Sequence, residues 1–90
     1  MSPYIKQDQR FQLNDHIDKL VYSMDHMGDD ARKGVFNYVI TKIALGVIGK
    51  ELKYGKINDV VGAMECCKME YYARKTRPYE EKKAIENGEV

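Results

Sequence analysis

The residues best suited to chemistry lie near the C-terminus, where tyrosines alternate with basic side chains. Aromatic faces interleaved with guanidinium groups suit an anionic or nucleobase-bearing ligand, because rings stack on bases and arginine binds phosphate through paired hydrogen bonds. The constellation consists of Lys68, Tyr71, Tyr72, Arg74, Lys75, Arg77 and Tyr79. The residues assigned to ligand binding within it are Lys68, Tyr72, Arg74, Arg77 and Tyr79.

The same stretch also reads as an ordinary helix end. Tyr71 then belongs to the core, and the stem of Lys68 lies along apolar surface. Glu70 and Arg74 are four residues apart, which is the usual spacing of an ion pair on a helix. The remaining cations complement the negative end of the helix dipole. Both interpretations stay open at this point.

Two polar residues lie within the most apolar part of the chain, residues 36–48. Asn37 and Thr41 are four apart and share one side of the expected helix. Polar atoms on such an apolar element are costly without partners, so we expect both to be hydrogen-bonded inside the domain. If this helix packs beside the next one, both side chains can also contribute hydrogen bonds to the ligand site.

The sequence contains no residue pattern typical of a metal site or of a catalytic site. His16 and His26 are ten residues apart on one expected helix, about 15 Å along its axis. Cys66 and Cys67 are adjacent and point about 100° apart on a helix, so neither zinc nor an ordinary disulfide is expected. No glycine-rich phosphate loop or nucleophile motif is present in the sequence. We therefore predict no catalytic residue, no metal, no cofactor and no enzymatic activity.

Composition narrows the class of protein. Ninety residues with 43% hydrophobic and 32% charged side chains are typical of one ordered globular domain, residues 1–90. A net charge of +1 gives no electrostatic reason to expect nucleic-acid binding. No run of about 18 apolar residues or signal pattern occurs, so no membrane association is expected. Adjacent cysteines fit a reducing compartment, and we predict a cytoplasmic location.

Hydrophobic periodicity predicts an all-α fold, a compact small helical bundle. The predicted elements are an N-terminal arm over 1–12, main helices over 13–27, 35–48 and 56–75, and a short helix over 78–86. Asn14 is the expected N-cap of the first helix, and the segment 28–34 has the composition of a surface loop. Pro78 is expected to break the third helix and to open the short one.

The third helix has two apolar sides. Its main face is expected to pack on the other two helices and comprises Ile57, Val60, Val61, Met64, Cys67 and Tyr71. A second stripe of small and flexible side chains comprises Gly62, Cys66, Met69 and Ala73. Such a stripe suits a close helix crossing, and a small core gains from pairing. We therefore predict a homo-oligomer, most simply a dimer, with this stripe at its interface.

Five short segments are distinctive: Pro3-Tyr-Ile-Lys, Asn37-Tyr-Val-Ile-Thr, Met64-Glu-Cys-Cys-Lys-Met-Glu-Tyr-Tyr, Pro78-Tyr-Glu-Glu-Lys-Lys and Glu86-Asn-Gly-Glu-Val. Together they resemble a family of small uncharacterised proteins from bacteria and their phages. The resemblance covers nearly the whole chain and implies a shared fold and a phage or prophage setting, but no activity. Two departures are Asn14-Asp15, where an aspartate followed by proline is expected, and a longer loop at 28–34.

Two hypotheses about function follow. In the first, the protein is a ligand-binding module for a small anionic or nucleotide-like molecule. In a phage setting such a module would sequester a nucleotide-derived signal, by analogy with other small helical phage proteins. In the second, it is a protein-protein interaction module, or an inhibitor, that binds a host or sibling protein through its helical surfaces.

Overall fold

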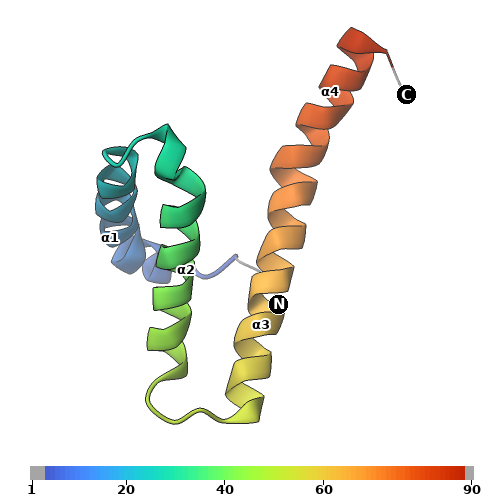
Figure 1. Cartoon of the computed structure of the whole chain (residues 1–90). Helices are drawn as coiled ribbons and strands as arrows, with labels where there is room; N and C mark the ends of the chain where they lie inside the picture. The colour runs from blue at the N-terminus through green and yellow to red at the C-terminus, as the bar shows by residue number, and fades with distance from the viewer. Residues whose placement is uncertain (1–3, 89–90) are drawn as a thin grey trace.

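The computed structural model describes residues 4–88, and within that range the protein is all-α, as predicted (Figure 1). The helices are α1 (Gln7–Asp25), η1 (Asp29–Ala31), α2 (Arg32–Ile48), α3 (Tyr54–Tyr71), η2 (Tyr72–Thr76) and α4 (Arg77–Asn87). Residues 1–3, which begin the expected arm, and residues 89–90 lie outside the described part of the chain.

The first helix is longer than expected, because α1 begins at Gln7 rather than at residue 13. Lys6 has extended backbone angles and its N–H donates to Gln9 Oε1 at 3.3 Å. Arg10 Nε donates to the carbonyl oxygen of Ile5 at 2.9 Å. These contacts cap the new helix start, so Asn14 lies inside the helix and is not its cap. The conformational restraint from a proline reaches only the residue before it, which leaves residues 7–12 free to be helical.

The segment expected as a loop over 28–34 is mostly helical. Gly28 turns the chain with a φ of 88°, a value that favours glycine, and the short 3-10 helix η1 follows directly. α2 then starts at Arg32 rather than at residue 35 and ends at Ile48. Arg32 pairs with Asp29 across this junction, which joins η1 to the first turn of α2.

The third and fourth expected helices form one continuous rod (Figure 1). Pro78 does not break the rod. It lies in the first turn of α4, and the π-helical turn η2 comes immediately before that helix. Inside an α-helix the proline ring collides with the carbonyl four residues earlier and lacks an N–H. A π turn takes in one extra residue and so accommodates such a defect while the rod continues.

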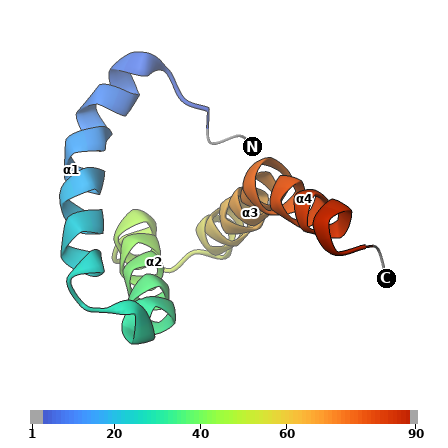
Figure 2. The same cartoon turned by 90° about the horizontal axis from the view of Figure 1, so that it is seen from above.

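The helices are arranged as an open arc. α1 packs against α2 and α2 packs against α3, whereas α4 projects beyond the other helices (Figure 1). Seen from above, the segment before α1 returns across the opening towards α3 (Figure 2). That return is held by a hydrogen bond between Tyr4 and Glu70.

The structure of the single chain does not confirm the expected compact bundle. No described side chain is buried, and the radius of gyration is 16.4 Å, against about 12 Å for a compact domain of this length. The accessible surface is 8355 Å², against about 5400 Å² for a folded monomer of this mass. Three helices arranged in an arc leave one side of each without a neighbour. The chain therefore exposes about 3000 Å² more than a compact monomer would.

The packing face of α3 also differs from the prediction. Its half-buried residues are Val60, Ala63, Cys66 and Glu70. Much of the expected main face is open instead: Val61 is 56% exposed and Tyr71 is 65% exposed. The reason is that α1 does not reach α3, so α2 and the N-terminal segment cover only one side of this helix.

Candidate functional site

The residues predicted to bind an anion all lie on the rod formed by α3, η2 and α4. Two of the cations have carboxylate partners: Lys68 Nζ is 3.0 Å from Glu65, and Arg74 Nε is 3.0 Å from Glu70. Arg77 instead lies over the ring of Tyr72, with 5.8 Å between the guanidinium carbon and the ring centre. The pair of Glu70 and Arg74 is the one that the helix-end interpretation expected, whereas Lys68 pairs with Glu65 instead. Arg77 has an aromatic partner that suits an anion.

Tyr72 and Tyr79 are both exposed on their helical turns, at 44% and 61%. A hydrogen bond with Glu80 raises the pKa of the Tyr72 hydroxyl, so this ring is tied to α4. Lys83 lies over the ring of Tyr79 at 5.8 Å. Neither tyrosine lines the two hollows described below.

Glu70 is the centre of a cluster that the sequence did not reveal. Tyr4 donates its hydroxyl to Glu70 Oε1 at 2.7 Å, and Arg74 Nε donates to the same oxygen at 3.0 Å. The Arg74 guanidinium carbon also lies 6.0 Å from the centre of the Tyr4 ring. We call Tyr4, Glu70 and Arg74 the latch, because they tie the N-terminal segment to α3.

The latch shifts the pKa of each of its members. The hydrogen bond from Tyr4 and then that from Arg74 lower the pKa of the Glu70 carboxyl from its ordinary 4.5. The hydrogen bond to Glu70 and then desolvation raise the pKa of the Tyr4 hydroxyl from 10.0. The lowered pKa of the Glu70 carboxyl stabilises the folded form at pH values above the ordinary carboxyl pKa, and this stabilisation is lost as the pH falls through the lowered pKa. The raised pKa of the Tyr4 hydroxyl acts in the opposite sense. It stabilises the folded form below pH 10.0, and this stabilisation is lost as the pH rises through the raised pKa.

We expect the latch to be closed between about pH 4.5 and 10 and to open at both extremes. Amide chemical shifts of Ile5 and Lys6, followed by NMR as the pH is lowered, should report the acid transition. In Glu70→Gln the side chain still accepts a hydrogen bond but cannot titrate, so the acid step should vanish. An unchanged acid step in that variant would mean that another group releases the segment.

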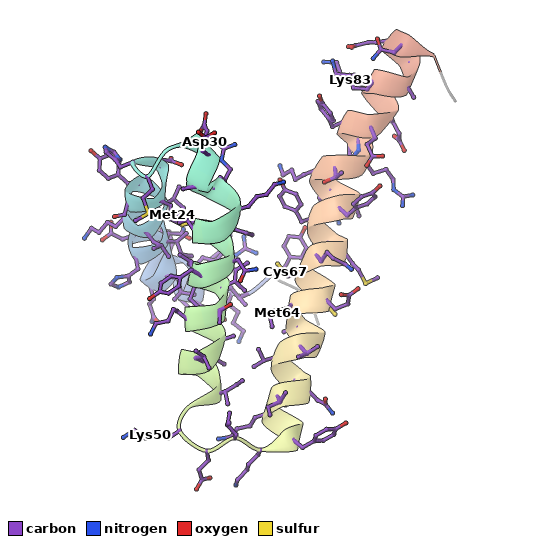
Figure 3. The ribbon with its side chains drawn as sticks, in the orientation of Figure 1. Met24, Asp30, Lys50, Met64, Cys67 and Lys83 are labelled. Atoms are coloured by element: carbon purple, nitrogen blue, oxygen red, sulfur yellow. The ribbon has the colours of Figure 1, made fainter. Side chains whose placement is uncertain are left out.

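Asn37 and Thr41 lie in a hollow between α2 and α3, separate from the tyrosines and arginines. The hollow has a volume of about 390 Å³ and is lined by Lys33, Phe36, Asn37, Ile40, Thr41 and Met64. Met64 faces into the gap between the two helices (Figure 3). Thr41 Oγ1 donates to Asn37 Oδ1 at 3.3 Å. The two residues are thus hydrogen-bonded, but to each other on an exposed surface rather than inside a core.

A second hollow of about 240 Å³ lies where α1 meets α2. Its lining is Val21, Met24, Asp25, Gly28, Asp29, Arg32, Val35 and Phe36. Met24 lies between the two helices there (Figure 3). Phe36 lines both hollows, so its face of α2 looks between α1 and α3. Sequence reasoning assigned Phe36 and Met64 no role at a surface, because both are ordinary members of helical stripes. It placed Lys33 in the expected loop over 28–34.

The potential metal ligands remain scattered. Within residues 4–88, no group of three His, Cys, Asp or Glu side chains is placed to hold a metal ion. His26 Nδ1 lies 2.8 Å from the carbonyl oxygen of Tyr22, and its ring contacts that of Tyr22. Cys66 is half-buried and Cys67 exposed, both as free thiols. No helix of the described chain is long and apolar enough to cross a membrane.

Most of the small-residue stripe is open in the single chain, although Cys66 is half-buried. A Cβ built on Gly62 would meet nothing within 4 Å, and Met69 is 61% exposed. Gly46 on α2 is equally open. No segment of the described chain therefore makes the close helix crossing that glycine at these positions would permit.

Comparison with known proteins places the chain in a family but adds no activity. No curated protein and no solved structure matches it. One family model does match, described as a domain of unknown function, and the match extends over residues 1–90. The chain therefore belongs to the family of this domain, DUF6899.

Proposed function

We propose that this protein is a non-enzymatic helical interaction module whose first partner is a second copy of itself. The observation that carries the proposal is the lack of a core: no described side chain is buried, although the composition is that of a globular protein. Covering the excess of about 3000 Å² on each of two chains would bury about 6000 Å² in total, which is on the scale of the largest obligate interfaces, of roughly 5000 Å² or more over both partners.

In this proposal the bundle expected from the sequence is completed between chains. Each copy contributes its half-packed helices, and the apolar faces that one arc leaves open are covered by the other. The sequence predicts the stripe of Gly62, Cys66, Met69 and Ala73 as the contact, and the exposed face of α3 that carries Val61 and Met64 is the other candidate. A closed two-fold dimer is the simplest assembly that covers such faces without leaving further apolar surface exposed for association.

The proposal also concerns setting. We place the protein in the cytoplasm, which for a phage-encoded chain is that of the host. A host or sibling protein is the further class of partner, because surfaces that pair two copies can also capture a different helical protein. The genes adjacent to this one would identify such a partner most directly.

Sedimentation equilibrium at micromolar protein concentration tests self-association. We expect a species of twice the chain mass, and a Tm that rises with protein concentration, because mass action stabilises an assembled fold. A single-chain mass that persists up to millimolar concentration, with a constant Tm, would rule the proposal out.

A second candidate function is favoured by Arg77, whose guanidinium stacks on Tyr72 while Lys68 and Arg74 are paired with carboxylates. A phosphate-bearing nucleotide would bind with its base along the tyrosines and its phosphate on Arg77. Titration with mono-, di- and cyclic nucleotides in low salt should give saturable binding. Arg77→Ala should weaken that binding at least about tenfold, because charged hydrogen bonds contribute roughly 1.5–3 kcal/mol.

The matched control is Lys56→Ala. It removes a cation near the start of α3, far along the rod from Arg77, and should leave nucleotide binding unchanged. Absence of binding at millimolar nucleotide would remove this candidate. Equal weakening by both variants would reduce it to a general effect of charge.

A further inference from the structure

An exposed stripe runs along the rod with the spacing of a coiled-coil seam. Its first five positions are Ile57, Val61, Met64, Lys68 and Tyr71, separated by four, three, four and three residues. This alternation places apolar side chains on one line that faces a partner helix. The stripe is uncovered in the single chain, since Ile57 is 36%, Met64 41% and Tyr71 65% exposed.

The π turn η2 keeps this stripe straight where the sequence alone would misplace it. Because the turn takes in one extra residue, the position after Tyr71 is Thr76 rather than Lys75. The spacing then resumes at Tyr79, Lys83 and Glu86. We call the full set the seam: Ile57, Val61, Met64, Lys68, Tyr71, Thr76, Tyr79, Lys83 and Glu86.

The seam lies beside the open hollow of α2 and α3. Met64 belongs to both, since it lines that hollow opposite Phe36 and Ile40. A helix laid along the seam therefore also covers the hollow. It would contact α2 and α3 together, as neighbouring helices do in a four-helix bundle.

We propose that the occupant is the same rod of a second copy, packed antiparallel along the seam, so that two α2–α3 hairpins form one four-helix bundle. This deepens the self-association proposed above by naming its surface. The seam suits itself in this orientation: the intervals four and three from Ile57 to Met64 recur when it is read backwards from Lys83 to Thr76. In that register Val61 faces Tyr79 of the other copy, and Met64 faces Thr76.

The remaining contacts agree with this pairing. Lys68 of one copy faces Tyr71, the next seam position of the other, and a cation over an aromatic ring is a favourable contact. α4 forms the end of the rod and projects beyond the other helices (Figure 1). Pairing gives α4 a neighbour and covers part of the 8355 Å² surface, which exceeds that of a compact monomer.

Two methionines on α3 provide a matched test, because both are exposed in the single chain and lie on different faces. Met64, in the seam, is 41% exposed, whereas Met69, in the small-residue stripe, is 61% exposed. A glutamate at either position contacts no buried group of the monomer. Met64→Glu should weaken the dimer at least about 100-fold by placing an unpaired charge between helices, and Met69→Glu should leave the dissociation constant unchanged.

Sedimentation equilibrium of both variants, with helix content checked by circular dichroism, gives the answer. Dimers of Met64→Glu, or dissociation by Met69→Glu alone, would overturn the seam while leaving self-association standing. A wild-type monomer would instead remove the proposed function itself.

Register is tested by Val61→Cys with Tyr79→Cys in a background lacking Cys66 and Cys67. We expect oxidation to yield a covalent dimer, and failure to crosslink an intact dimer would overturn the register.

Discussion

Replacing Phe36 by alanine is expected to lower the free energy of unfolding of the assembled protein by about 3–5 kcal/mol, the range for truncating a fully buried phenylalanine. In the single chain Phe36 is 57% exposed, so an isolated molecule would lose only roughly 1 kcal/mol. The difference arises because Phe36 lines both hollows, and in the proposed dimer the partner helix would fill the one beside Met64. Chemical denaturation at fixed protein concentration measures the loss.

Tyr38→Ala is the matched control on the same helix. Tyr38 is 65% exposed and lies two residues on, about 200° around the helix from Phe36. Its removal should change stability by no more than about 0.5 kcal/mol, as is usual for surface positions. Similar small losses for both variants would show that Phe36 stays in water, and that the protein has no hidden core around it.

Replacing Pro78 by alanine is expected to stabilise α4 by about 1–3 kcal/mol, because proline inside a helix lacks an N–H and collides with the preceding turn. The π turn η2 relieves that collision but leaves the missing hydrogen bond. Since α4 opens locally, amide hydrogen exchange over 79–87 should slow by roughly 5- to 150-fold. Exchange measured by NMR resolves these residues individually.

Lys82→Ala serves as the control for this measurement, because lysine and alanine both favour helix and neither lacks an N–H. Its exchange rates should stay within about threefold of the parent, equivalent to the roughly 0.5 kcal/mol of an ordinary surface change. Unchanged or faster exchange in Pro78→Ala would mean that the proline is not strained, and that the π turn has another origin.

The helical class of this protein was readable from its sequence because it depends on local periodicity. The apolar spacing in residues 13–27 and 56–75 matches the α-helical repeat, and no alternating strand pattern competes. The residues at which the helices begin and end could be predicted less well from the sequence. The start of α1 at Gln7 depends on the side chains of Gln9 and Arg10 folding back onto Lys6 and Ile5. The passage through Pro78 depends on a π turn that no composition signal marks.

The candidate site divides in the same way. The pairing of Glu70 with Arg74 and of Thr41 with Asn37 follows from residues four apart on a helix, so sequence spacing indicated both neighbourhoods. Tyr4 joins Glu70 across 66 positions of the chain, and a contact at that distance has no periodic signature. The sequence likewise suggested Asn37 and Thr41 as contributors to the ligand site of the tyrosines and arginines. In the structure they line a hollow together with Met64 and Phe36.

What the sequence determined by itself is which residues are helical and which sides of those helices are apolar. What only the tertiary structure decided is which of those sides are covered. The main face of α3 was expected to be core, yet Val61 and Tyr71 remain exposed because α1 turns away along the arc. A helix specifies its apolar face through nearest-neighbour chemistry, but the burial of that face depends on where distant segments, or another chain, come to lie.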